Sequence, residues 1–280
     1  MFPLKTILIS NDPGVAEDAQ AAGIARIMVD LETSEEKKVR QSTRKTFIST
    51  HTRADIPKMR KVVKEAELVV RINGWNSNSF EEIDFVVGAG ADRIMLPMIT
   101  SLAQWESFLE RLDGRAKPFP LVETGYSMAH ISSIAAEKTV DDIFIGLNDL
   151  HLSLGLDFLF EPLGLGLIDW MASQIFAAGK HFGFGGMATL HSGELPAERI
   201  LAEHVRLNST GVILSSRFNK DVRMNEPEGR RERISDAMKQ LQVEYHRLAK
   251  RNALQQHEDS KQTFALIRQL AERARTRSSF

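Results

Sequence analysis

The sequence contains no cysteine. Disulfide bridges, thiolate nucleophiles and cysteine-ligated metal sites are therefore excluded for this chain. It also lacks a run of about 20 apolar residues, the length that a membrane-spanning helix needs, so we expect no membrane partner. Lys and Arg together number 36, Asp and Glu number 37, and the net charge is −1. Without an excess of positive charge, the composition does not predict binding to nucleic acid.

The first ten residues, MFPLKTILIS, contain a hydrophobic stretch that is soon interrupted by Asn11, Asp12 and Pro13. This stretch is too short for the apolar segment of a signal peptide, so we expect a cytoplasmic protein. The length of 280 residues suits one large domain. Barrels of alternating strands and helices commonly form a single domain of about 250 residues.

Eight short apolar segments recur along the chain and are predicted to be strands. Most are apolar at consecutive positions, which is typical of strands that are buried on both faces of a parallel sheet. They cover residues 6–10, 26–31, 68–72, 93–98, 119–122, 142–146, 182–186 and 211–215.

Amphipathic segments lie between the strands and are predicted to be helices. They cover residues 15–22, 55–66, 79–88, 102–112, 127–137, 168–179 and 196–207. Several have proline near the start or glycine near the end, as helix termini prefer. Strands that alternate with helices form parallel sheets, and eight such repeats favour a closed (β/α)₈ barrel of the α/β class.

The barrel is expected to occupy residues 1–225, and the character of the sequence changes beyond them. Residues 226–280 are rich in charged residues and glutamine, with apolar residues at helical spacing. A first helix here is expected to complete the barrel. A second, near residues 264–270, would pack on a neighbouring subunit of a homo-oligomer, or would form a solvated tail.

Polar residues follow most of the predicted strands. In (β/α)₈ barrels the active site lies at the carboxyl ends of the strands. Charged groups are costly beside a hydrophobic strand unless they are paired or bind a metal, so these residues predict a convergent polar site. They are Asn11, Asp12, Asp30, Glu32, Arg71, Asn73, Glu123, Asn148, Asp149, Ser215, Ser216 and Arg217.

Five segments carry a resemblance to a known family: VDLE, VVRIN, GADRIMLPMI, PLVET and DDIFIGLNDLHLSLG. Together they resemble the HpcH/HpaI aldolase and citrate lyase β-subunit family over about residues 6–218. The last two segments are the most specific, because they place Glu123 and Asp149 26 residues apart in the family order. The resemblance implies a barrel that binds Mg²⁺ or Mn²⁺ and forms or cleaves a carbon–carbon bond next to a carbonyl.

The resemblance implies that Glu123 and Asp149 are the metal ligands, and Mg²⁺ does prefer carboxylate oxygens. Either residue could instead cap the following helix. Arg71 is expected to stabilise negative charge on the substrate, or else to form a structural ion pair with Asp30 or Glu32. These two carboxylates would orient water or the arginine.

Further contacts to the substrate are expected from Asn148, Gly185 and Gly186. The two glycines lie at a strand end, where their backbone N–H groups could bind a carboxylate or phosphate. They could equally serve only for close packing.

The sequence departs from the aldolase branch of the family at Thr33, where that branch has a histidine. In this respect it is closer to the citrate lyase branch. The proton would then be moved by a metal-bound water that Asp30 or Glu32 orients, which we favour, or by His51. His51 lies in the segment STHTRAD and could also be an ordinary surface histidine.

The leading functional hypothesis is a metal-dependent lyase or aldolase that acts on a small 2-oxo or hydroxy acid through an enolate. An acyl-CoA lyase is the first alternative, because Arg40, Arg44, Lys45 and Arg53 could form a basic patch for a CoA thioester. A solvated basic loop would explain the same residues. The second alternative is a binding protein that kept the barrel and lost turnover, as the missing histidine would allow.

Overall fold

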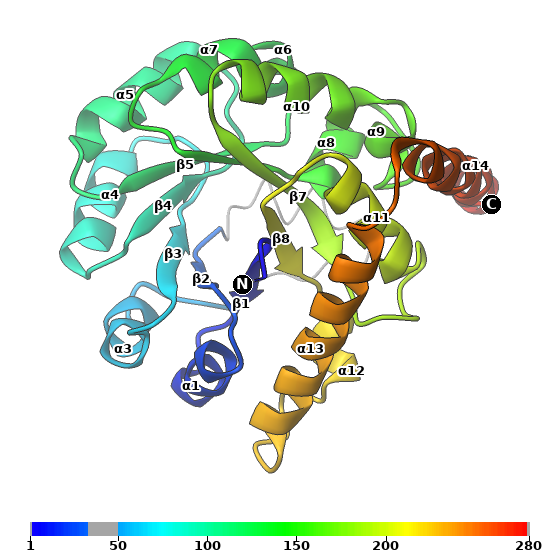
Figure 1. Cartoon of the computed structure of the whole chain (residues 1–280). Coiled ribbons are helices and arrows are strands. Elements are labelled where there is room, and N and C mark those ends of the chain that lie inside the picture. The colour runs from blue at the N-terminus through cyan, green and yellow to red at the C-terminus, as the bar shows by residue number, and fades with distance from the viewer. Residues whose placement is uncertain (1, 33–49, 279–280) are drawn as a thin grey trace.

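The computed structural model describes residues 2–32 and 50–278. Eight parallel strands close into a barrel in the order of the sequence, with helices around it (Figure 1). The predicted (β/α)₈ barrel is confirmed. The strands are β1 (Lys5–Ile9), β2 (Arg26–Asp30), β3 (Glu67–Arg71), β4 (Arg93–Leu96), β5 (Lys117–Val122), β6 (Asp142–Ile145), β7 (His181–Met187) and β8 (Gly211–Leu214). Pairing of β8 with β1 closes the barrel.

The helices lie where the amphipathic segments predict them, with three short additions. The principal ones are α1 (Pro13–Ala21), α3 (Asp55–Val62), α4 (Ser79–Gly88), α5 (Leu102–Leu112), α10 (Leu167–Ala177) and α11 (Ala197–Arg206). The single helix predicted over residues 127–137 is instead two, α6 (Gly125–Ala129) and α7 (Ile131–Ala136). The additions are α8 (Leu147–Ser153), α9 (Glu161–Gly164) and α12 (Ser216–Asp221).

The barrel interior has an apolar middle and two charged ends. Side chains alternate along a strand, so every second residue points inward. The upper end, at the carboxyl ends of the strands, contains Asp30 and Arg71, whereas the lower end contains Arg26 and Glu67. Between them lies a cluster of Ile7, Met28, Val69, Met95, Phe119, Leu121 and Phe144.

A buried ion-pair network fills the lower end. The Nε atoms of Arg26 and Arg93 both donate to Oε2 of Glu67, each at 2.8 Å. Burial alone would raise the pKa of Glu67, but Arg93 and Arg26 outweigh it and lower the pKa to about 2. Both guanidinium groups also lie over the ring of Phe119. These contacts satisfy charges that would otherwise be costly inside a barrel.

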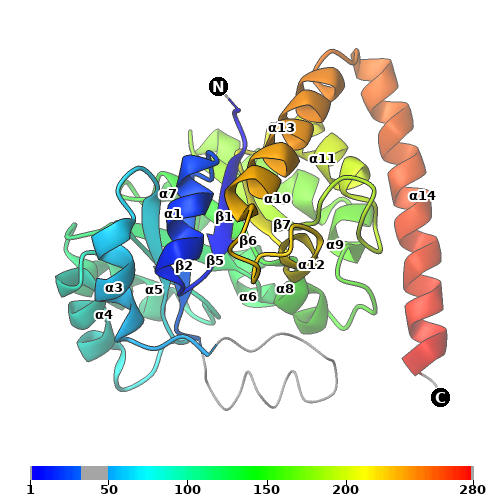
Figure 2. The ribbon, with the colours of Figure 1, turned by 90° about the horizontal axis from the view of Figure 1, so that it is seen from below.

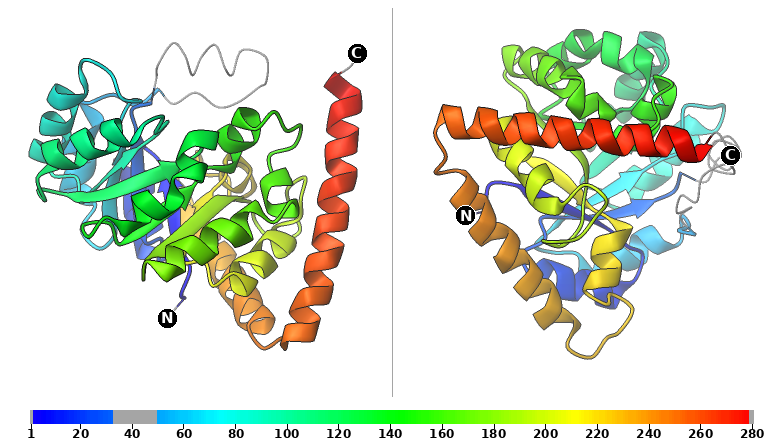
Figure 3. Two further views of the ribbon diagram at one scale, coloured as in Figure 1. Left: turned by 90° about the horizontal axis from the view of Figure 1, so that it is seen from above. Right: turned by 90° about the vertical axis from the view of Figure 1, so that its right-hand side faces the viewer.

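The C-terminal segment forms two long helices. Helix α13 (Arg230–Leu248) contacts α1 and α11 and completes the ring around the barrel. Helix α14 (Ala253–Ser278) runs along the outside of the barrel and packs on α9 and α11 of its own chain (Figures 2 and 3). Its buried face includes Thr263, Ile267 and Leu270, so α14 is not a tail surrounded by solvent. That this segment packs on a neighbouring subunit stays a prediction.

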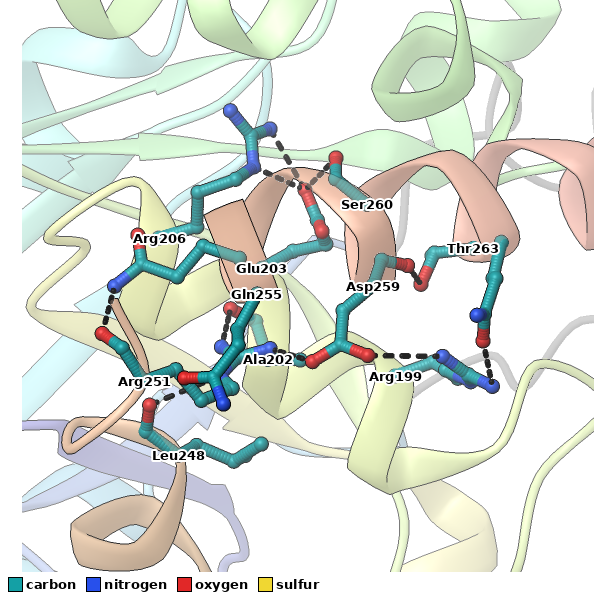
Figure 4. Close-up of polar contacts among 12 residues, drawn as sticks. Arg199, Ala202, Glu203, Arg206, Leu248, Arg251, Gln255, Asp259, Ser260 and Thr263 are labelled. Carbon is teal, nitrogen blue, oxygen red and sulfur yellow. Dashed lines mark hydrogen bonds and ion pairs between the residues drawn. The ribbon is translucent and has the colours of Figure 1, made fainter. Parts of the chain in front are cut away.

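Polar contacts attach α14 to α11 (Figure 4). The hydroxyl of Ser260 donates to the buried carboxylate of Glu203 at 3.4 Å, and Arg199 donates to Gln262 at 3.1 Å. In the linker before α14, Arg251 donates to the carbonyl oxygen of Ala202 at 3.1 Å. In the part of the chain that the structure describes, no helix is both long and apolar enough to cross a membrane.

Candidate active site

Acidic residues and one arginine gather at the upper end of the barrel. Asp30 and Arg71 are partners in the register of β2 and β3. Glu123 directly follows β5, and Asp149 lies in the first turn of α8, just after the neighbouring strand β6. Asp30, Glu123 and Asp149 are buried, as is Glu32. The structure therefore brings these predicted site residues to one end of the barrel.

Arg71 is held by the two carboxylates of the β2 end. Its Nε donates to Oδ1 of Asp30 at 2.8 Å and its Nη2 donates to Oδ2 at 2.7 Å. Oε2 of Glu32 lies 3.5 Å from the same Nε. Burial would lower the pKa of Arg71, but Asp30 and Glu32 raise it, so the guanidinium stays charged. The structural ion pair considered from the sequence is confirmed.

This ion pair occupies only one edge of the guanidinium. The side chain of Arg71 remains 13% exposed. Within residues 2–32 and 50–278, no hydrogen bond involves its Nη1 atom. A guanidinium carries five N–H groups in a planar fork, so the same arginine can bind a carboxylate or carbonyl of a substrate.

The carboxylate of Glu123 is positioned by backbone on both sides. On the β4 side, the N–H of Met98 donates to its Oε1 at 3.0 Å. Met98 has a φ of 52°, in the left-handed region that non-glycine residues seldom adopt. On the β6 side, Gly146 lies so close to Oε2 that a side chain there would collide with it. The helix-cap alternative for Glu123 is wrong, because Thr124 caps α6.

The electrostatics of the upper end favour a bound cation. Burial raises the pKa of Glu123 well above its usual range, and the negative charges of Glu32 and Asp149 raise it further. The positive charge of Arg71 acts in the opposite direction, but the pKa of Glu123 is still raised. A divalent cation would remove this repulsion.

The donor set fits Mg²⁺ or Mn²⁺. Mg²⁺ typically takes one or two carboxylates and leaves its other positions to water and substrate oxygens. Glu123 and Asp149 supply two carboxylates. Among the described residues, no group of three or more His, Cys, Asp or Glu side chains is arranged to hold a metal. With two carboxylates as ligands, other positions of the coordination shell would be open to water and substrate oxygens.

His51 lies beside the Asp30–Arg71 pair. Its side chain is buried, and its Nδ1 lies 3.0 Å from the backbone nitrogen of Asp30, which donates to it. The alternative of an ordinary surface histidine is wrong. Burial lowers the pKa of His51; Asp30 and Asp55 oppose this shift, and Arg71 adds to it.

A family model described as HpcH/HpaI aldolase/citrate lyase matches residues 7–219. The chain belongs to this family. The resemblance seen in the sequence is thus confirmed, and the family supports a lyase of the HpcH/HpaI type. No match is found among curated protein sequences.

Several solved structures share the fold at low sequence identity. An HpcH/HpaI aldolase from Desulfitobacterium hafniense is 15% identical, with a TM-score of 0.58 over 76% of this chain and 86% of that one. A family protein from Burkholderia cenocepacia is 16% identical, with a TM-score of 0.59 over 80% and 91%. The citrate synthase SbnG is 16% identical, with a TM-score of 0.60 over 84% and 95%.

The remaining predicted contact residues lie around the same end of the barrel. Gly185 has a φ of 64°, and a register shift separates Gly183 from Gly186 in the pairing of β7 with β8. This irregular backbone requires glycine at Gly185 whether or not it binds substrate. Asn148 is half-buried in the first turn of α8.

Three of the polar strand-end residues have structural partners instead. The side chain and backbone N–H of Asn73 donate to Glu82, and Asn11 donates to Asp55. Arg217 pairs with Asp221 on its own helix.

Only one residue of the proposed basic patch can be located. Thr33, Arg40, Arg44 and Lys45 lie outside the described residues. Arg53 pairs with Glu81 and lies over the ring of Phe85. No observation therefore supports a CoA-binding patch.

An open hollow of about 980 Å³ lies at the opposite, lower end of this HpcH/HpaI barrel, near Glu67 and Lys117. The catalytic groups of (β/α)₈ barrels come from the carboxyl ends of the strands. The hollow is lined by residues of both charge signs, including the ion pair of Arg60 with Asp92. We therefore assign the candidate active site to the upper end.

Two contacts that position Glu123 could not be predicted from the sequence. The backbone N–H of Met98 and the missing side chain of Gly146 position Glu123, and neither residue has chemistry of its own. The sequence offers one weak indication of each contact. In LPMI, Met98 follows a proline, and in GLND, Gly146 directly follows a strand.

Proposed function

We propose that this protein is a divalent-metal-dependent carbon–carbon lyase or aldolase that acts on a small 2-oxo or hydroxy acid. The observation that carries the proposal is the buried group of Glu32, Glu123 and Asp149 beside Arg71. Burial and the neighbouring charges of Glu32 and Asp149 raise the pKa of Glu123, and a cation bound beside these carboxylates would relieve both effects.

Glu123 and Asp149 would hold Mg²⁺ or Mn²⁺. When bound, the ion supplies Lewis-acid stabilisation of negative charge on a substrate oxygen. Met98 and Gly146 keep Glu123 in position for this role.

Arg71 would bind the carboxylate or carbonyl of the substrate. Asp30 and Glu32 hold its guanidinium at a constant orientation, so little rearrangement is needed when substrate arrives. When the carbon–carbon bond of a 2-oxo acid breaks, its electron pair delocalises onto the carbonyl oxygen as an enolate. A preorganised guanidinium stabilises such a developing charge. Asn148 and the N–H groups of Gly185 and Gly186 would make further substrate contacts.

Metal titration and an assay of turnover test the proposal. Isothermal titration calorimetry should detect Mg²⁺ or Mn²⁺ binding to the wild-type protein, and Glu123→Gln and Asp149→Asn should abolish it. Circular dichroism would verify that both variants keep the barrel. Oxaloacetate decarboxylation, which passes through the pyruvate enolate, is the activity to measure. Wild-type metal affinity in both variants would contradict the assignment of the ligands.

The same experiment separates the alternatives. Metal binding without turnover of any 2-oxo acid would favour a binding protein that kept the barrel. Turnover of an acyl-CoA thioester but not of the free acid would favour an acyl-CoA lyase.

A further inference from the structure

The contact between His51 and Asp30 determines which nitrogen of the imidazole carries its proton. The backbone N–H of Asp30 points at Nδ1 of His51, with 3.0 Å between the two nitrogens. A backbone amide can only donate, so Nδ1 must accept and carries no proton. The neutral ring therefore has its proton on Nε2.

The ring takes the place of a missing strand partner. The N–H of Leu31 donates to the carbonyl oxygen of Arg71 on β3, so the N–H of Asp30 faces the other side of β2. That side belongs to β1, which ends at Ile9. Nδ1 of His51 accepts the bond that a longer β1 would take.

A group of hydrogen bonds holds the segment of His51 in place. Oδ2 of Asp55 accepts from the backbone N–H of Thr52 at 2.9 Å and from its hydroxyl at 3.0 Å. The same oxygen accepts from Nδ2 of Asn11, at 3.1 Å, in the loop after β1. Asp55 thereby ties the residue next to His51 to the end of β1.

The histidine in turn supports the group that holds Arg71. The amide that it accepts from belongs to Asp30, whose carboxylate takes both hydrogen bonds of the Arg71 fork. A change in the position of the Asp30 backbone would shift this carboxylate and the guanidinium together.

We propose that His51 is a positioning residue, neutral with its proton on Nε2, that fixes the Asp30–Arg71 pair and does not serve as the proton acceptor of the reaction. In the neutral ring Nε2 already carries a proton and Nδ1 is engaged, so neither nitrogen can take another without breaking the bond to Asp30. Among the described residues, the charged groups around the ring are Asp30, Asp55 and Arg71, and burial lowers the pKa of His51 against the effect of the two carboxylates. The part of the proposal that concerns turnover rests on the proposed function, but the protonation state does not.

Nitrogen NMR of the ring tests the protonation state in the full-length, metal-free protein. We expect the ¹⁵N shifts of His51 to show a bare Nδ1 and a protonated Nε2, unchanged between about pH 6 and pH 8. A protonated Nδ1, or a charged ring in this range, would overturn the proposal. This measurement needs no substrate.

Two variants test the role. In His51→Asn, the side-chain oxygen can accept from the Asp30 amide much as Nδ1 does, whereas His51→Ala cannot. We expect His51→Asn to keep slow hydrogen exchange of the Asp30 amide and near-wild-type turnover. His51→Ala should lose the protection and about tenfold in turnover, the effect of one buried hydrogen bond. His257→Asn, in the outer helix α14, is the control and should behave as wild type.

If His51→Asn is as inactive as His51→Ala and both lose the acidic limb of the pH–rate profile, where a catalytic base becomes protonated, His51 is the base and the proposal fails. If the wild-type protein turns over none of the substrates tested, the proposed function fails by itself. The NMR shifts and the exchange of the Asp30 amide would still decide how His51 acts.

Discussion

A Cβ atom at Gly146 would lie 2.9 Å from Oε2 of Glu123, closer than side-chain atoms approach one another. Gly146 has a φ of −84°, which alanine can adopt, so a side chain there is opposed by crowding alone: by this oxygen, and by Cβ of Glu123 and Cδ1 of Leu121, each at 3.1 Å. Gly146→Ala should therefore displace the carboxylate and weaken Mg²⁺ binding by about tenfold, the lower range for residues that orient metal ligands. Isothermal titration calorimetry would measure the change.

Gly88→Ala is the matched control, because nothing lies within 4 Å of its added carbon. It should bind Mg²⁺ as the wild type does. An unchanged affinity in Gly146→Ala would show that Glu123 is not a ligand or that its carboxylate can move freely.

Arg71→Lys should separate substrate chemistry from metal binding. Lysine offers one ammonium group and cannot reproduce the two-pronged contact with Asp30 together with a second contact to substrate. We expect turnover to fall by about a hundredfold, as for the loss of one donor to a developing oxyanion, with little change in Mg²⁺ affinity. Steady-state kinetics and metal titration on the same preparation would measure both. An unchanged turnover number would mean that Arg71 only holds Asp30 and Glu32 in place.

His204 should make the protein less stable in mild acid. Its buried ring stacks on Phe184 at 4.0 Å and its Nδ1 lies 2.9 Å from the hydroxyl of Ser209. Burial lowers its pKa from 6.5 to about 3. Because the unfolded chain takes up the proton first, the stability present above pH 6.5 is lost as the pH falls towards 3, by up to about 1.4 kcal/mol per pH unit.

Urea unfolding of the wild type and of His204→Phe at pH 7 and pH 5 would measure this contribution. Phenylalanine keeps the stacking surface but cannot titrate, so the variant should lose less stability between the two values. Equal losses would show that the ring is protonated in the folded protein.

The lower end of the barrel should matter for stability and not for metal binding. Arg93 is almost fully buried and pairs with both Glu67 and Asp141. Arg93→Met leaves these carboxylates without their main partner and should cost about 3 kcal/mol in the free energy of unfolding. Mg²⁺ affinity should not change, because the apolar middle of the barrel lies between. Arg115→Met, which removes the exposed pair with Asp84, should cost no more than about 1 kcal/mol.

The fold was predictable because the middle of most strands is apolar on both faces. In β2 the consecutive apolar residues Ile27, Met28 and Val29 mark the strand although Arg26 and Asp30 flank them, and the helices between the strands repeat a simple amphipathic pattern. The three additional helices were not predictable, since seven, four and six residues are too few for a helical period to be recognised. The division of residues 127–137 into α6 and α7 depends on the backbone of His130, which leaves the helical region.

Of the candidate site, the sequence predicted the charged residues but not the contacts that position them. Glu123, Asp149, Arg71 and Asp30 follow strands, and their position at one end of the barrel is a consequence of parallel pairing. The role of His51 could not be deduced, because it depends on where a long connection returns to the barrel. The role of Met98 could not be deduced either, because its backbone conformation is set by neighbours that are distant in sequence.

The contact of Asp18 with Arg230 has a consequence for how the protein is made. Nε of Arg230 donates to Oδ2 of Asp18 at 2.7 Å and joins α1 to α13 across 212 positions of sequence. A ribosome makes the chain from its N-terminus, so α1 is synthesised long before Arg230 of α13 is available to pair with it. During that interval the flank of α1 that α13 later covers is exposed, and so is the edge of β1 that pairs with β8 once the barrel closes.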